Sequence, residues 1–168
     1  MCNTLGNIFR LCIIGGVALG LTMQFLATFA CDFILTPNGG VGIWYIEDEN
    51  GDCVEWPTTD GFVTGSQTAL TFATCAGFIT GVLVAIEWIL CEICCAGCVE
   101  GIGFCIAWVA GGATFTMYGI DACSVSDGED PLCEWGPASS YMIVANVTYL
   151  CCGILLCCTP QPEPICKK

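Results

Sequence analysis

The sequence contains no histidine, and only three of its 168 residues are basic. The absence of histidine excludes Ser-His-Asp and Cys-His catalytic sites, His-ligated haem and His-containing zinc sites. A nucleic-acid-binding protein needs cations to neutralise phosphates, whereas this chain has 16 acidic residues and a net charge of −13. We therefore expect no nucleic-acid partner.

Charged residues of either sign are also scarce. They make up 11% of the chain, and hydrophobic residues make up 55%. A typical soluble domain has about 25% charged and about 45–50% apolar residues. So few charges cannot cover the surface of a soluble globular enzyme, and so many apolar residues exclude a disordered tail.

Four apolar stretches are each long enough to cross a bilayer as a helix, which takes about 20 residues. Too little of the chain remains to bury four such stretches in a soluble protein, so we predict an all-α membrane protein, a single four-transmembrane-helix bundle. The first stretch has 20 apolar residues, more than the about 7–15 of a signal-peptide core, and we expect it to be retained. The predicted helices are residues 11–30, 69–91, 101–119 and 141–158.

The few basic residues predict the orientation of these helices. Arg10, Lys167 and Lys168 flank the first and last stretches, and an even number of spans places both termini on one side. The positive-inside rule makes that side cytoplasmic. Twelve of the 16 acidic residues then fall in two outer loops, residues 31–68 and 120–140, with an inner turn at 92–100 and an inner tail at 159–168. We expect an integral protein of a eukaryotic plasma membrane.

Seventeen cysteines make up about a tenth of the chain. Four of them, Cys31, Cys53, Cys123 and Cys133, lie in the predicted outer loops, where disulfides form. Four cysteines allow three pairings. The simplest pairs Cys31 with Cys53 and Cys123 with Cys133, and a pairing between the loops is the alternative.

Most other cysteines lie near the predicted cytoplasmic boundary, where disulfides are not expected. Juxtamembrane cysteines are common sites of S-acylation, so we predict lipidation of several of them. The alternative is that they pack as small apolar residues. The candidates are Cys2, Cys12, Cys94, Cys95, Cys98, Cys157, Cys158 and Cys166.

A tandem C-x-x-C pattern runs from the end of the second predicted helix into the inner turn, at Cys91, Cys94, Cys95 and Cys98. Four thiolates can hold zinc or an iron–sulfur cluster, and a C-x-x-C pair can also be redox-active. All four lie within eight residues, whereas zinc sites usually combine two separated pairs. We therefore predict no cofactor here and expect bound lipids instead.

The first outer loop predicts a small disulfide-braced β-hairpin over residues 41–56. Trp44 and Tyr45 favour a strand, and Asn50-Gly51 is a strong signal for a two-residue turn. Asp48, Asn50 and Asp52 also resemble the first half of a calcium loop, although the glycine and glutamate that complete an EF-hand are missing. The candidate interaction residues on the loops are Trp44, Tyr45, Trp56 and Trp135.

Within the predicted helices, small residues and one acid stand out. Two glycine pairs, Gly16 with Gly20 and Gly77 with Gly81, have the spacing that lets helices approach closely in lipid. They indicate packing within the bundle or a dimer face. Glu87 is an intramembrane acid, which is a functional candidate. Its alternatives are extension toward the inner membrane surface or pairing with Arg10.

The layout of four spans, inner termini and a larger first loop resembles the claudin and peripheral-myelin-protein superfamily. The residues that carry the resemblance are Gly42-Ile43-Trp44, similar to the Gly-Leu-Trp of the claudin first loop, and the downstream Cys53. That family has two cysteines after the tryptophan, whereas here Cys31 precedes it. The resemblance implies a loop-borne β-sheet, side-by-side association in the membrane, and adhesion or accessory-subunit roles.

Three functions fit these observations. The first is a non-enzymatic tetraspan protein that forms homo-oligomers or joins a larger membrane complex as a structural, adhesion or accessory subunit. The second is a membrane thiol–disulfide oxidoreductase similar to vitamin K epoxide reductase, although its C-x-x-C units and loop cysteines lie at opposite membrane faces. The third is a subunit of an oligomeric cation channel with acidic vestibules.

Overall fold

The computed structural model describes residues 2–37, 39–56, 61–89, 96–120, 123 and 133–159, without the side chains of residues 2–5. Four helices dominate this part of the chain, and all four are long and apolar enough to span a membrane. The chain is therefore an integral membrane protein, as its composition predicts. The helices are α1 (Cys2–Phe29), α2 (Gly61–Ile89), α3 (Ala96–Ala113) and α4 (Pro137–Cys158), and α3 continues into a short 3₁₀ helix, η1 (Thr114–Gly119).

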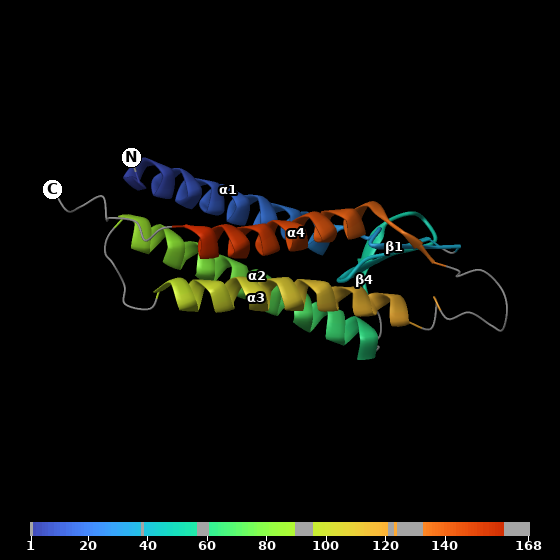
Figure 1. Ribbon diagram of the computed structural model, residues 1–168. Coiled ribbons are helices and arrows are strands. Elements are labelled where there is room, and N and C mark those ends of the chain that lie inside the picture. Colours follow the sequence, from blue (N-terminus) through green and yellow to red (C-terminus); the bar gives the residue numbers. More distant parts are fainter. Residues whose placement is uncertain are drawn as a thin grey trace.

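The helices pack side by side along their length (Figure 1). α1 contacts α4 and α2, and α3 contacts α2 and α4. α1 begins and α4 ends at one end of the bundle, which we call the terminal end, while the β-strands lie at the opposite end, which we call the sheet end (Figure 1). Large apolar side chains such as Phe25, Phe72 and Val109 point away from the bundle, as expected for helices surrounded by lipid.

The helices start earlier than their apolar runs. α1 begins at residue 2 instead of 11, α2 at 61 instead of 69, α3 at 96 instead of 101, and α4 at 137 instead of 141. The early part of α2 is polar, and its side chains find partners: the Ser66 hydroxyl hydrogen-bonds the Thr116 hydroxyl, and Gln67 donates to the carbonyl of Ile43. α4 begins with Pro137, a residue suited to the first helical turn.

Both loops contribute strands to one five-stranded antiparallel sheet, ordered β4-β3-β2-β1-β5. The predicted hairpin is present as the pair β3–β4, but the prediction missed the other three strands, which have only two or three residues each. β5 comes from the second loop, so the sheet joins both loops into one unit. The strands are β1 (Ile34–Thr36), β2 (Gly39–Val41), β3 (Tyr45–Glu47), β4 (Cys53–Glu55) and β5 (Glu134–Trp135).

The register places one row of apolar residues across all five strands. Ile34 pairs with Trp135 and Val41, Val41 pairs with Ile46, and Ile46 pairs with Val54. Ile34 and Val41 are buried in a core that also contains Val63 from α2 and Met117 from η1. The sheet therefore rests on the bundle through this row, whose outermost members, Val54 and Trp135, remain exposed.

The turn of the β3–β4 hairpin differs from the expected two-residue turn. The amide of Gly51 donates to the carbonyl of Asp48 at 3.0 Å, and the amide of Asp48 donates to the carbonyl of Asp52 at 2.9 Å. Three residues therefore lie between the paired ends. Gly51 has a φ of 84°, which matches a type I turn followed by a left-handed residue.

Two disulfides brace the sheet end, and they have the simplest of the three pairings. Cys31 bonds Cys53, which ties the end of α1 to the edge strand β4. Cys123, just after η1, bonds Cys133, which directly precedes β5. Each disulfide joins two cysteines of the same loop, and neither connects the two loops.

The glycine pairs pack against side chains within the bundle. A Cβ at Gly16 would meet the Cys152 thiol, and a Cβ at Gly81 would meet Val17. Gly20 and Gly77 both border the ring of Tyr149, which lies between α1 and α2. These glycines therefore provide the space that α4 and α1 side chains occupy.

Candidate functional site

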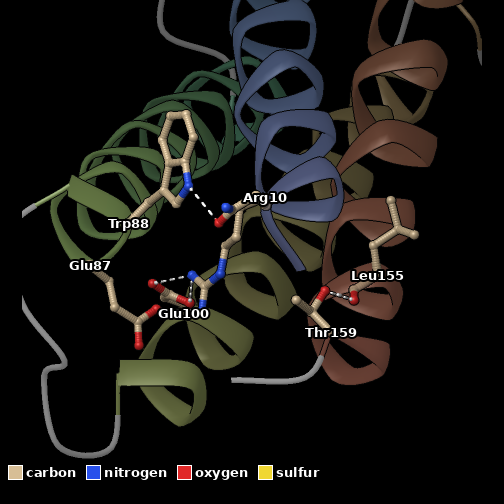
Figure 2. A network of polar contacts seen from close by, with 7 residues as sticks. Arg10, Glu87, Trp88, Glu100, Leu155 and Thr159 are labelled. Atoms are coloured by element: carbon tan, nitrogen blue, oxygen red, sulfur yellow. Dashed lines mark hydrogen bonds and ion pairs between the residues drawn. The ribbon is translucent and has the colours of Figure 1, made fainter. Parts of the chain in front are cut away.

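Three charged side chains meet at the terminal end of the bundle, one from each of α1, α2 and α3 (Figure 2). Nη2 of Arg10 lies 2.5 Å from Oε2 of Glu87. Nη1 of Arg10 donates to both carboxylate oxygens of Glu100, at 3.1 and 3.3 Å. We call these three residues the ion cluster.

The ion cluster is enclosed by protein. Glu100 is 0% exposed and Arg10 is 4% exposed, and the Glu87 side chain is 12% exposed. Glu87 therefore pairs with Arg10, which was one of its two expected arrangements. An exposed ion pair contributes little stability, whereas removing one partner of a buried pair leaves an uncompensated charge at a large cost.

Glu100 is the member that sequence reasoning missed. It was assigned to an inner turn of residues 92–100, but α3 already starts at Ala96, and this places Glu100 one turn inside the helix. Its carboxylate then faces Arg10 instead of water. One signal could have found it. Lys167 and Lys168 follow α4, which leaves Arg10 as the one basic residue before the last helix. Any acid buried among the helices would therefore have Arg10 as its candidate partner.

Neutral hydrogen bonds flank the ion cluster (Figure 2). Nε1 of Trp88 donates to Oδ1 of Asn7 at 3.2 Å, which joins the end of α2 to the start of α1. Thr159 donates to the carbonyl of Leu155 at 2.6 Å and closes the end of α4. The terminal end of the bundle is thus held by polar contacts among helices whose outward surface is apolar.

At the sheet end, the candidate interaction residues separate into two places. Trp44, Tyr45 and Trp56 line a small pocket of about 250 Å³ between the β3–β4 hairpin and α2, together with Glu55 and Gln67. The indole of Trp56 donates to the carbonyl of Gly42 at 3.0 Å, so this ring has a structural contact. The fourth, Trp135, lies on β5 at the opposite edge of the sheet.

Trp135 is the outermost ring of an aromatic cluster. Its ring centroid lies 5.6 Å from that of Phe115 and 5.7 Å from that of Tyr118, both in η1. Phe33 packs behind them, 5.5 Å from Phe115. Trp135 is nevertheless 61% exposed, which makes it a large apolar side chain with one covered and one open face.

The carboxylate of Asp48 stabilises the turn of the β3–β4 hairpin. Oδ1 of Asp48 accepts hydrogen bonds from the amides of Asn50 and Asp52, at 2.8 and 2.9 Å. These bonds, with that from Asp52 the stronger influence, hold the pKa of Asp48 below its usual value of 3.8. Asn50 also donates from its side-chain amide to Oδ2 of Asp48 at 3.3 Å, whereas Asp52 contributes its backbone amide. The resemblance of Asp48, Asn50 and Asp52 to a calcium loop stays a prediction.

The predicted lipidation cysteines are exposed where they are described. Cys12, Cys98, Cys157 and Cys158 have exposed thiols on α1, α3 and α4. The side chain of Cys2 and the residues Cys91, Cys94, Cys95 and Cys166 lie outside the described part of the structure, and the C-x-x-C hypothesis lies there with them.

An open apolar groove of about 1510 Å³ runs along α2, α3 and α4. Phe72, Trp108 and Ile154 are among its lining residues. Gly65, Gly97 and Gly101 also line it, and a Cβ at these glycines would meet no atom within 4 Å. The bundle therefore has two kinds of glycine. Some lie against side chains of a neighbouring helix, and others face the open space of this groove.

Comparison of the sequence with protein-family models and with curated proteins gives no match.

Proposed function

We propose that this chain is a non-enzymatic tetraspan protein that acts as a structural, adhesion or accessory subunit of a membrane assembly, and that the sheet end is its contact surface. The observation that carries the proposal is the position of Trp135. This residue lies on the edge strand β5, is 61% exposed, and is supported from behind by Phe115 and Tyr118. Tryptophan is enriched among the residues that dominate protein–protein binding energy.

The construction of the sheet supports this role. Strands from two loops share one sheet, and two disulfides restrict it. A surface that is ordered before binding loses less entropy when a partner binds. Among the described residues, the outermost strands β4 and β5 have no further strand beside them, and such edges can pair with another chain.

The resemblance to the claudin and peripheral-myelin-protein superfamily belongs to the same proposal. A loop-borne sheet on four apolar helices is what that resemblance implies, and it is present here. The order of Cys31 before Trp44 still departs from the family pattern. With the sheet end outside, both termini would be cytoplasmic, and side-by-side association in a plasma membrane would produce a homo-oligomer or a larger complex.

Lipids complete the proposed assembly. Acyl chains of the bilayer are the proposed occupants of the groove along α2, α3 and α4, because its lining is apolar and its helices are long enough to span a membrane. Exposed Cys12, Cys98, Cys157 and Cys158 remain the proposed sites of S-acylation, since they lie toward the terminal end of the bundle.

Site-specific photo-crosslinking tests the contact surface. A photoreactive phenylalanine analogue replaces Trp135 in one variant and Trp108, a groove-lining residue of α3, in a matched control. After irradiation of intact membranes, the proposal predicts a discrete protein adduct at position 135 and lipid adducts at position 108. Lipid adducts alone at position 135 would show that Trp135 is a membrane-interface anchor and would refute the proposed contact surface.

A further inference from the structure

The ion cluster contains more negative than positive groups. One guanidinium faces two carboxylates, so the cluster carries a net charge of −1 when all three groups are ionised. Arg10 and Glu100 are each at least nine-tenths buried. An uncompensated charge in such a place is strongly unfavourable, and a buried group in this situation usually becomes neutral instead.

The hydrogen bonds show the same imbalance. Glu100 receives two hydrogen bonds from Nη1 of Arg10. Oε2 of Glu87 is buried and in ion-pair contact with Arg10, but it accepts no hydrogen bond from the described residues. Buried oxygen atoms in folded proteins nearly always have a donor. Oε2 of Glu87 instead has an ion-pair contact with Arg10 but no hydrogen-bond donor among the described residues.

The neighbouring elements supply no second cation within the described residues. α1 contributes Arg10, α2 contributes Glu87, and α3 contributes Glu100. α4 has no acidic or basic residue, and its titratable groups nearest this end are the exposed thiols of Cys157 and Cys158. On α3, the Cys98 thiol is exposed as well.

We propose that the ion cluster is a proton-binding site, in which one proton is shared between the carboxyl groups of Glu87 and Glu100. The proton comes from water and forms an O–H bond on one carboxyl group. That group donates a hydrogen bond to the other, which remains ionised beside Arg10. The cluster is then electrically neutral, and when the proton is on Glu100 it supplies the donor that Oε2 of Glu87 lacks. This site is independent of the contact surface proposed at the sheet end.

Proton binding at this position couples to stability. The cluster joins α1, α2 and α3, and in the unfolded chain at neutral pH both glutamates are ionised. The folded protein then binds one proton more than the unfolded chain, so its stability falls as the pH rises. While the folded state retains this extra proton, the unfolding equilibrium constant rises by up to tenfold per pH unit, and the rise ends once the folded state has lost the proton.

Infrared spectroscopy tests the site directly. In the full-length protein in lipid nanodiscs at neutral pH, the proposal predicts the carbonyl stretch of a protonated carboxylic acid, which disappears at high pH. Glu100→Gln and Glu87→Gln should each remove this signal, because each leaves Arg10 with a single carboxylate. Glu134→Gln, at an exposed glutamate in β5, is the matched control and should retain the signal.

Thermal unfolding gives a second readout that does not depend on assigning a band. The wild-type protein should lose stability on alkaline titration more steeply than Glu100→Gln. The absence of a carboxylic-acid band from the wild type near neutral pH would overturn the proposal. So would a band that persists in both glutamine variants, or equal pH dependences for the wild type and Glu100→Gln.

Discussion

The hydroxyl of Tyr149 in α4 donates a 2.9 Å hydrogen bond to Oε1 of Gln24 in α1, and both side chains are fully buried. The ring of Tyr149 occupies the space next to Gly20 and Gly77, so one aromatic side chain connects three helices. In lipid there is no hydrophobic driving force for apolar helices to associate. Close packing and hydrogen bonds between the helices must therefore stabilise the bundle. Tyr149 supplies both.

Filling the space beside Tyr149 should destabilise the bundle. In Gly77→Ala, the new Cβ would lie 2.6 Å from the Tyr149 hydroxyl oxygen. Overpacking of this kind typically costs about 1–3 kcal/mol, so we expect a lower thermal unfolding midpoint in detergent. Gly101→Ala is the matched control, because its Cβ would meet no atom within 4 Å and alanine favours a helix. Equal midpoints for the two variants would contradict the packing role.

Removing only the hydroxyl should have a smaller effect. Tyr149→Phe leaves the ring in place but removes the donor to Gln24. Hydrogen bonds between membrane helices contribute about 0.6 kcal/mol on average and up to about 1.7, and we expect a loss in this range. Tyr141→Phe, at an exposed tyrosine of the same helix, should change the free energy of unfolding less. The hydrogen bond has no stabilising role if the two variants unfold alike.

The Cys31–Cys53 disulfide should stabilise the hairpin edge of the sheet. It joins residues 22 apart in sequence, and loop-closure entropy predicts about 3 kcal/mol for a cross-link of this length. Serine at both positions should speed amide exchange in β4 and lower the unfolding midpoint. The Cys123–Cys133 bond spans 10 residues, and its removal should cost less. Peptide mapping without reduction that found bonds between the two loops would contradict both predictions.

Asp48 should make the hairpin turn sensitive to acid. Because amide hydrogen bonds from Asp52 and Asn50 lower its pKa, its ionised form is favoured in the folded protein. Its contribution is present above about pH 4 and is lost as the pH falls through the lowered folded-state pKa. Amide exchange at Asn50 and Asp52 should accelerate over that range. Asp48→Asn keeps a side-chain acceptor and should remove this pH dependence, while Asp48→Ala should leave exchange fast at every pH.

Much of the helical architecture is predictable from the sequence, because 20-residue apolar runs have few alternatives. The ends of the helices are not. The polar stretch around Ser66 and Gln67 becomes helical because η1 and the residues after β2 provide its partners, and no local pattern indicates those contacts. The same limit applies to β1, β2 and β5, whose two or three residues pair only through tertiary structure.

Only part of the ion cluster could be predicted from the sequence. Glu87 and Arg10 could be paired on the basis of scarcity, since a buried acid needs a cation and Arg10 lies on a neighbouring helix. Glu100 was not found because the start of α3 was placed five residues too late, which turned a buried helical residue into part of a turn. Because the start of α3 was predicted too late, one of the two carboxyl groups of the ion cluster was not recognised.

The measurement that tests the proposed function most directly is native mass spectrometry of the unreduced protein, extracted from its membrane in mild detergent. We predict a defined assembly larger than the 17.7 kDa chain, built from several copies or from this chain and a partner, with bound lipid and acyl-sized mass increments. A bare monomer under conditions that preserve other membrane complexes would contradict the assembly role. A metal- or quinone-sized ligand on that monomer would favour thiol redox chemistry instead.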